Sequence, residues 1–345
     1  MTTFRVPAVV LIFLLAFWNG AVVSLTFGFQ IRAFEVARDQ APLELICRNV
    51  FGGTDYLPTM APKYAADPSC WFMVLASKQN DTPIAVANLR VFEESKSFWL
   101  EGVRVSEEHR NKGIAQELVS SMVELARHEG LERILTCTIQ SNQAMRRIFD
   151  KIGMEFVTEL DATSFQQLQK LPGWSAKDLA SPKSLLSAMG IEHLVSKDAQ
   201  EQKWWLVNSV SEMNDVLDRI KKHGGCGYFP GLFELLSPKG PLETSLNEGR
   251  VWACGDAIFA LVRDERIASL KSNWLLSVST ITEIGLQAAI WRACSEEGIL
   301  LLDGHVGFSV AFDCTDPTDG KFCSALKLSE DKALLYELEF NASDF

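Results

Sequence analysis

A short basic segment, "RVSEEHRNKGIAQEL" (residues 104–118), carries residue types that could bind an anion. Arg110, Lys112 and Gly113 stand just before a run of apolar residues at helical spacing, so the glycine is expected at or beside a helix start. A helix start presents unpaired backbone N–H groups and the positive end of the helix dipole, and glycine lets a bulky anion approach them. The pattern therefore predicts a phosphate site. The alternative is a solvated basic turn that caps a surface helix.

A candidate general base, Glu101, lies in the strand-like segment 98–105 just before this basic segment. With regular alternation Glu101 would share a face with the apolar residues Trp99, Val103 and Val105, which would desolvate its carboxylate and make it a better proton acceptor. Such a carboxylate could take a proton from an amine nucleophile. The alternative is a carboxylate at the rim that faces solvent or pairs with Arg90.

Gly102 is the neighbour of this glutamate inside the same strand pattern. Glycine weakens regular strand packing, so its presence indicates a β-bulge or a close approach by another segment. An ordinary twist of the strand is the simpler interpretation.

The segments around these residues alternate between strand and helix patterns. Polar turns separate a run of successive strands, which predicts a meander, and helices then alternate with strands, which indicates a mixed α/β sheet. The expected strands are 30–36, 71–77, 84–92, 98–105, 133–139 and 154–159, and the expected helices are 38–50, 113–129 and 142–152.

The second half of the chain repeats this order of elements. Residues 161–203, with several prolines and glycines among polar fragments, are expected to form a connector. Residues 204–345 then contain an amphipathic helix at 211–225, several strand-like runs and a helix at 283–298. The turn before that last helix has no arginine and no glycine loop, so a second domain of the same plan would lack the phosphate site.

Composition limits the classes of function. The net charge of -11, from 33 Lys+Arg against 44 Asp+Glu, excludes a long nucleic-acid footprint, because such binding needs clustered cations. The 8 cysteines include no C-x-x-C pair and none lies at ligand spacing from histidine, so no metal site is expected. Free thiols are favoured over disulfides. The 345 residues suffice for two domains.

Residues 6–29 are mostly apolar and long enough to span a bilayer, which would be the only expected membrane contact. Polar and small residues interrupt this run at 18–20, small residues at 22–24 resemble a cleavage site, and a strand pattern follows almost at once. We therefore expect residues 1–28 to be a cleaved signal or targeting segment that directs the chain to the secretory pathway or an organelle. An uncleaved anchor is the second interpretation, and a misassigned start codon in a cytoplasmic protein is the third.

The order of elements in residues 29–160 resembles that of the GNAT superfamily of acyl-CoA N-acyltransferases. The family signature is Arg or Gln, two residues, Gly, one residue, then Gly or Ala, which Arg110, Gly113 and Ala115 match. The later segment "SNQAMRRIFDKIGMEF" is similar to the second family motif, with Asn142 at the start of its helix. The strings "FGGTDYLP" and "LEGVRV", together with the long C-terminal half, look most like the histidine N-acetyltransferase branch. The resemblance implies a GNAT catalytic domain at 29–160 and a degenerate GNAT-like domain at 204–345.

This resemblance implies acetyl-CoA as co-substrate. Backbone N–H groups of the basic turn would hold its pyrophosphate, its pantetheine arm would pair with the edge of strand 98–105, and an N–H group near Val103 would stabilise the oxyanion. The implied acetyl-CoA-binding residues are Val103, Arg104, Val105, Arg110, Asn111, Lys112, Gly113, Ile114, Ala115 and Asn142.

The implied reaction is transfer of acetyl to the α-amino group of a small amino acid, with histidine the best single guess. Glu101 would be the base, and Asp55 and Tyr56 are the candidates for the acceptor pocket. Phe149 stands where the family often has a tyrosine that protonates the departing thiolate, and phenylalanine cannot donate a proton. The acid therefore stays open among Tyr56, Tyr64, Ser141 and a water. A non-catalytic acyl-CoA-binding sensor or scaffold of the same fold is the alternative function.

Overall fold

The computed structural model describes most of the chain and divides it into two compact units. Unit 1 comprises Met1–Thr136, Ala144–Glu155 and Glu337–Phe345, and unit 2 comprises Cys137–Gln143 and Phe156–Tyr336. The described residues are 23–24, 28–92, 96–164, 192–224, 228–229, 236, 241–255, 257–263, 273–295, 307–316, 322 and 333–340.

Unit 1 is built on a mixed sheet in the order β1-β2-β3-β4-β5-β6, and the end of β13 follows β6. The strands from β2 to β5 pair antiparallel in sequence order, which confirms the predicted meander, and β6 pairs parallel with β5. The strands are β1 (Val23–Ser24), β2 (Phe29–Ala33), β3 (Cys70–Ser77), β4 (Pro83–Phe92), β5 (Ser97–Val105), β6 (Arg133–Ile139) and β13 (Ala333–Glu339).

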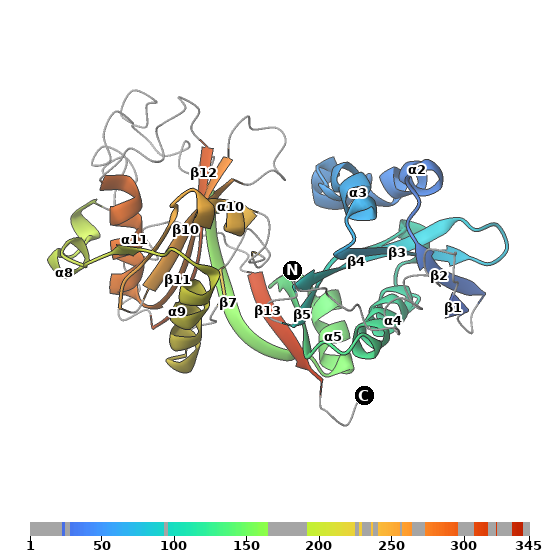
Figure 1. Ribbon diagram of the computed structural model, residues 1–345. Coiled ribbons are helices and arrows are strands. Elements are labelled where there is room, and N and C mark those ends of the chain that lie inside the picture. Colours follow the sequence, from blue (N-terminus) through green and yellow to red (C-terminus); the bar gives the residue numbers. More distant parts are fainter. Residues whose placement is uncertain are drawn as a thin grey trace, which may run out of the picture. The chain divides into compact units, whose positions relative to one another are not determined.

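Helices cover both faces of this sheet. Figure 1 shows α2 and α3 on one face and α4 and α5 on the other. The sequence analysis did not predict α3, which contains Pro62 and has Pro58 in its first turn, where proline is tolerated. The helical elements are α2 (Val36–Cys47), η1 (Val50–Gly53), α3 (Leu57–Ala66), η3 (Glu107–His109), α4 (Ile114–His128) and α5 (Gln143–Ile152).

An ion pair fixes the start of α2 against β2. Both guanidinium NH groups of Arg32 donate to the fully buried carboxylate of Asp39, at 2.6 and 2.9 Å. The same carboxylate accepts the backbone N–H of Glu35, so it also satisfies a donor at the helix start. Helix α2 is thereby held in place against the sheet.

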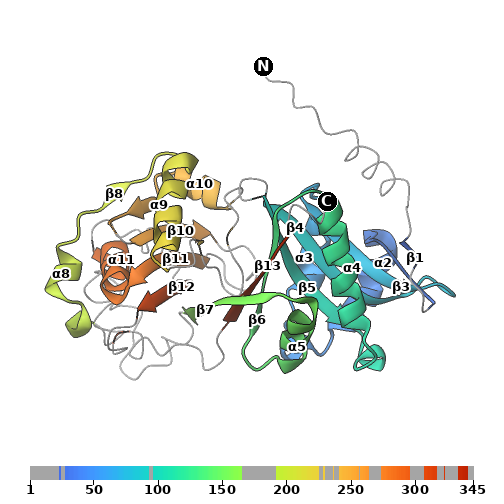
Figure 2. The same ribbon diagram turned by 90° about the horizontal axis from the view of Figure 1, so that it is seen from below.

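Helix α4 forms because its apolar residues recur on one face. Residues Ile114, Leu118 and Met122 are buried against the sheet, as the helical spacing predicts. Figure 2 shows α4 lying across the sheet. Gly113 is its N-cap residue with φ 79°, a left-handed conformation that favours glycine.

The face predicted for Glu101 is only partly right, because a β-bulge interrupts β5. The pairs Asn88↔Glu101 and Val86↔Arg104 show that one β4 residue opposes two in β5, Gly102 and its successor. The predicted bulge at Gly102 is confirmed, with φ 67° at that residue.

The extra residue reverses the alternation beyond the bulge. Residues that face each other across an antiparallel pair share a face of the sheet. Glu101 therefore lies with Arg104 on the α2/α3 face, while Val103 and Val105 do not share it, which corrects the predicted apolar set. Trp99, whose partner is Arg90, stays on the face of Glu101.

The end of the chain belongs to unit 1, which the sequence did not predict. The Arg133 guanidinium donates to Glu337 at 3.0 Å, and the N–H of Phe340 donates to the carbonyl of Glu132 at 2.8 Å. Phe340 is buried, and the guanidinium of Arg127 lies 5.3 Å from its ring centroid. Residues separated by about two hundred positions thus pack together, and such long-range contacts leave no local pattern.

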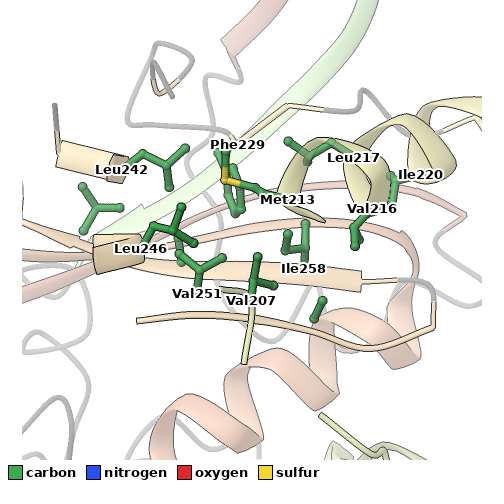
Figure 3. Close-up of a cluster of buried hydrophobic side chains, with 13 residues drawn as sticks. Val207, Met213, Val216, Leu217, Ile220, Phe229, Leu242, Leu246, Val251 and Ile258 are labelled. Carbon is green, nitrogen blue, oxygen red and sulfur yellow. The ribbon is translucent and has the colours of Figure 1, made fainter. Parts of the chain in front are cut away.

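Unit 2 has a sheet in the order β7-β12-β11-β10-β9-β8. Its apolar core includes Met213, Val216 and Ile220 of α9, which Figure 3 shows among the labelled cluster with Val251 and Ile258. The elements are β7 (Glu155–Ser164), η5 (Glu192–Leu194), α8 (Lys197–Gln200), β8 (Trp205–Leu206), α9 (Val210–Lys222), α10 (Pro241–Asn247), β9 (Val251–Ala253), β10 (Ala257–Arg263), β11 (Asn273–Thr282), α11 (Glu283–Ser295) and β12 (Gly307–Asp316).

The predicted amphipathic helix of this half is present as α9, but it starts earlier than expected. Its cap is Ser209, whose hydroxyl accepts the N–H of Glu212 at 3.1 Å. The order β10, β11, α11, β12, with β11 and β12 parallel, repeats the order β4, β5, α4, β6 of unit 1. Unit 2 therefore shares this local order of strands with unit 1, and its assignment as a second GNAT-like domain stays a prediction.

Several sequence predictions concern residues outside the described ranges. These are most of the apolar segment 1–28, where only residues 23–24 and 28 are described, and most of the connector 161–203. No helix within the described ranges is long and apolar enough to cross a membrane. Among the described residues, Cys47, Cys70, Cys137 and Cys254 are cysteines outside any disulfide.

Candidate active site

The basic turn between β5 and α4 has the backbone geometry of an anion site. Asn111 has φ 60° and Gly113 has φ 79°, so left-handed residues reorient successive N–H groups ahead of the helix. The N-cap residue Gly113 makes no side-chain hydrogen bond to the first turn of α4, and Arg110, Asn111, Lys112 and Gly113 are all exposed. The N–H groups of Ile114 and the next residues are therefore available to an anion, as the spacing predicts.

Arg110 is anchored beside this turn. Its Nε donates to the carbonyl of Val105 at 3.2 Å, and its NH1 lies 3.8 Å from the carboxylate of Glu107. That glutamate also accepts from the side-chain amide of Asn49 at 2.8 Å, so the turn is linked to the loop after α2. The Arg110 side chain is nearly half exposed and keeps donors that can face a phosphate.

The edge of β5 next to β6 is partly unpaired. The two strands pair only from Ser97 to Leu100, and no β6 residue pairs with β5 after that point. The N–H of Ser106, the residue after β5, donates to the carbonyl of Ile84. Because the backbone N–H and C=O groups of successive strand residues point to opposite sides, those of Val105 point away from β4. This open edge is the place where an extended ligand could add main-chain hydrogen bonds.

Glu101 lies where the pairing with β6 stops, and its carboxylate is held at both oxygens. Asn88, directly opposite on β4, donates from Nδ2 to Oε1 at 3.0 Å, and Arg90 lies 3.6 Å from Oε2. The glutamate side chain is 8% exposed, which excludes the interpretation of a carboxylate pointing to solvent. The ion pair with Arg90, which was the other predicted alternative, is present, but the 3.6 Å separation of its charged atoms leaves it weak.

Asp55 and Arg104 form a buried ion pair on the same face as Glu101. Arg104 donates from Nε and NH2 to the two carboxylate oxygens at 2.7 and 3.0 Å, and the Asp55 side chain is 1% exposed. Burial alone would raise the pKa of Asp55, but hydrogen bonds and charge from Arg104 outweigh it and hold that pKa below its ordinary value. Arg104, predicted to contact acetyl-CoA, thus directs its guanidinium to Asp55, a residue predicted for the acceptor pocket.

Cys47 of α2 lies beside this pair. Burial, and then the nearby Asp55 carboxylate, raise the pKa of the Cys47 thiol to about 12. The thiol therefore stays protonated at neutral pH and is a poor nucleophile. This environment argues against a mechanism that acetylates Cys47 first.

Two aromatic rings flank the guanidinium of Arg104. The carbon at its centre lies 5.2 Å from the ring centroid of Phe51 and 5.9 Å from that of Tyr56. Tyr56 precedes α3, and Tyr64 on the same helix is buried against Phe72. Of the candidate acids, Tyr56 is thus the one found next to the Asp55 and Arg104 pair.

The second motif positions Asn142 at the turn between β6 and α5. Its Nδ2 donates to the hydroxyl of Thr138 at 3.1 Å, and its backbone N–H donates to Ile139. Phe149 of α5 is buried, at 1% exposure, where the resemblance places a proton-donating tyrosine. The predicted roles of Asn142 and of the other site residues stay predictions.

The sequence did not point to Asn88, Cys47 or Phe51 as site residues. Asn88 and Cys47 lie in segments whose apolar character predicts core positions, and both are buried. Phe51 lies beside Gly52 and Gly53 in a segment that indicates a turn. Pairing across the sheet brings Asn88 to Glu101, and packing of α2 and of the segment after it brings Cys47 and Phe51 to the Asp55 and Arg104 pair. The local sequence gave no signal for Asn88 and Cys47, and for Phe51 it gave only its place in the string "FGGTDYLP".

Comparison with known proteins identifies this part of the chain. Residues 39–154 match the family model described as Acetyltransferase (GNAT) family. This segment is a GNAT-family domain. The matched range contains β5, the basic turn and α4, so the GNAT domain holds every predicted site residue of unit 1.

Two curated relatives are similar to part of the GNAT domain. Histidine N-acetyltransferase of Oreochromis niloticus is 28% identical over 96 residues, which are 27% of this chain and 28% of that protein. Histidine N-acetyltransferase of Scomber australasicus is 28% identical over 120 residues, 34% of this chain and 35% of that protein. The matches thus span about a third of the relatives' length. The solved structure of ribosomal-protein-S18-alanine N-acetyltransferase from Escherichia coli is similar at 16% identity and TM-score 0.34, covering 38% of this chain and 80% of that one.

Proposed function

We propose that the protein is an acetyl-CoA-dependent N-acetyltransferase that acts on the α-amino group of a small amino acid, with histidine as the best single guess. The observation that carries this proposal is the arrangement along β5. On β5, the buried Glu101 carboxylate lies on the α2/α3 face, and the main-chain edge toward β6 is unpaired after Leu100. The basic turn and the start of α4 follow the end of this strand. These features match the base, the acyl-arm site and the phosphate site of an acyl transfer from a coenzyme A thioester.

The geometry supports direct attack by the acceptor amine. The neutral amine nitrogen forms a bond with the thioester carbonyl carbon, and Glu101 accepts the proton that the nitrogen loses. A β5 backbone N–H near Val103, beside the bulge, stabilises the oxyanion while the C–S bond breaks. Asn88 and Arg90 orient the Glu101 carboxylate for this step. The thiolate takes a proton from Tyr56 or from water, because Phe149 has none to give.

The choice of an amino acid as acceptor has two supports. The names of the two curated relatives supply the specific suggestion of histidine. The pair of Asp55 and Arg104, flanked by Tyr56, supplies charged and aromatic groups on the face of the sheet that Arg104 shares with the base. A small zwitterion with a polar or flat side chain fits such a lining better than an apolar amine does.

Release of coenzyme A thiol, measured with acetyl-CoA and a panel of free amino acids, tests the proposal. The full chain should release thiol in proportion to added amino acid, and mass spectrometry of the product should show the α-N-acetyl derivative. Thiol release that does not depend on any amino acid or other amine would refute the transferase function.

The phosphate site can be tested separately with two variants on one helix. Gly113→Asp places a carboxylate at the uncapped start of α4, and acetyl-CoA affinity measured by calorimetry should fall at least about tenfold, or roughly 1.4 kcal/mol. Gly130→Asp is the matched control, because Gly130 also has a positive φ, of 71°, but lies just past the other end of α4. Equal affinities for the two folded variants would refute the assignment of the basic turn.

A non-catalytic acyl-CoA-binding sensor or scaffold is the second candidate, and Phe149 is the observation that favours it. Such a protein would bind acetyl-CoA at the same turn without needing an acid. It would bind acetyl-CoA by calorimetry and lose that binding in Gly113→Asp, yet release no thiol with any acceptor. The two measurements above therefore separate the candidates.

We also propose that the chain binds one acetyl-CoA, through unit 1. In unit 2, β11 and β12 pair from Asn273 to Thr282, so the equivalent edge is not open. The hydroxyl of Thr282 accepts the N–H of Gly285 at 3.0 Å, which occupies a donor at the start of α11, and Glu283 adds a negative charge there. A titration that gives two acetyl-CoA per chain would overturn this point.

A further inference from the structure

Phe51 combines two features that packing alone does not explain. Its side chain is 59% exposed, and its backbone lies in the left-handed region with φ 49°. That conformation costs a bulky non-glycine residue on the order of 1 to 2 kcal/mol. Residues held in such conformations gather at active sites and ligand-binding segments. Phe51 is not part of the core.

Contact with Arg104 gives the ring a defined place. One face of the ring lies over the Arg104 guanidinium, 5.2 Å from the centroid, and that guanidinium is itself fixed by Asp55. Asn49, two residues before Phe51, is tied to Glu107 beside the basic turn. Exposure of more than half of the side chain leaves the ring open to solvent on the side away from Arg104.

The open ring lies on the acceptor side of the candidate base. Arg104 and Glu101 share a face of β5, and their β4 partners are two residues apart, so the two positions are about 7 Å apart along the strand. This separation is comparable to the reach of an amino-acid side chain. A substrate whose amine meets Glu101 can therefore extend its side chain toward Phe51.

We propose that Phe51 determines acceptor specificity, by stacking its open ring face on the flat side chain of an imidazole or aromatic amino acid. The inference rests on the proposed function and deepens it, because it derives the class of acceptor from the loop and not from the relatives' names. Aromatic rings prefer offset-stacked or edge-to-face contact, and such a contact favours a flat side chain over an aliphatic one. The strained backbone prepares the ring before the substrate binds, which lowers the entropy lost on binding.

The test compares kcat/KM for flat acceptors (histidine, phenylalanine, tryptophan) with that for alanine in the full chain. Phe51→Asn removes the ring with a residue that tolerates positive φ, and Phe51→Tyr keeps the ring. Leu45→Ala is the matched control, because Leu45 is an apolar residue of α2 that is 67% exposed. We expect Phe51→Asn to lower kcat/KM about 3- to 10-fold for flat acceptors and less than twofold for alanine. Phe51→Tyr and Leu45→Ala should stay near the unmodified protein.

Thermal unfolding supplies the readout that separates recognition from a structural role. Phe51→Asn should unfold at the same temperature or higher, because it relieves strain and removes no core contact. Equal losses for alanine and histidine, or a marked drop in unfolding temperature, would overturn the inference while leaving an active acetyltransferase. Absence of transfer to any amine by the unmodified chain would instead overturn the proposed function, and the inference with it.

Discussion

Gly102 offers a quantitative test of how the bulge in β5 is maintained. Its φ of 67° lies in the left-handed region, and a Cβ built on it would stand 3.1 Å from Cδ1 of Leu57. Leu57 is fully buried at the start of α3, so its side chain has little room to move. Gly102→Ala therefore meets both a backbone penalty and a steric one.

The two penalties can be separated with Gly113→Ala. Gly113 also has a positive φ, of 79°, but its Cβ would meet nothing within 4 Å. Each alanine should cost about 1 to 2 kcal/mol of unfolding free energy through the left-handed backbone. Gly102→Ala should cost about 1 to 3 kcal/mol more, because it overpacks the site against Leu57. The gain from a less flexible unfolded chain is the same for both variants and cancels in the difference.

Urea unfolding of the full chain, followed through a probe in unit 1, measures these differences. Leu57→Ala closes a double-mutant cycle, since it should cost less in the Gly102→Ala protein than in the unmodified one, by about 1 kcal/mol. Equal costs for Gly102→Ala and Gly113→Ala, or a strictly additive cycle, would show that contact with Leu57 does not matter and would refute the reasoning.

Three further variants test other parts of unit 1. Glu101→Gln should lower kcat roughly 100-fold with acetyl-CoA affinity nearly unchanged, and normal turnover would place the base elsewhere. Asp55→Asn should cost about 3 kcal/mol of unfolding free energy at neutral pH by leaving Arg104 unpaired. Because the folded pKa of Asp55 is lowered, this stabilisation is complete above the unfolded pKa, near 3.9, and is lost as pH falls through the folded value. The difference from the unmodified protein should therefore shrink below about pH 4 in urea titrations, and a constant difference would contradict the ion pair. Phe340→Ala should lower the stability of unit 1 by about 3 kcal/mol, and an unchanged urea midpoint would show that the chain end is dispensable there.

Local patterns predicted the elements that carry the proposed phosphate site. The spacing of Ile114, Leu118 and Met122 gave the buried face of α4, and Gly113 marked its start. Both signals act within a few residues, where periodicity and backbone preference are decided by the sequence itself. The same holds for the meander, whose strands are joined by short polar turns.

Sequence reasoning failed where one residue changes the register or where distant segments meet. Glu101 was assigned to the face of Val103 because regular alternation was applied across Gly102, although a bulge shifts every later residue to the opposite face. The contact of Phe340 with Glu132 was not predictable, because nothing in either segment specifies the other. The pair of Asp55 and Arg104 was missed for the same reason, although each residue had been singled out alone.

The two units share a local order of strands but differ at the position of the proposed coenzyme site. In unit 1, pairing between β5 and β6 stops after Leu100, and a turn of exposed residues with positive φ separates β5 from α4. In unit 2, β11 is paired with β12 to its end and continues into α11 without a turn. Gly285 serves a different purpose from Gly113 there, because a Cβ on it would collide with the Thr280 hydroxyl. That glycine lets the helix pack closely on the strand, which removes the space that an anion would need. The open edge and the extra turn, and not the order of the strands, therefore distinguish the unit to which we assign the proposed coenzyme site from the other unit.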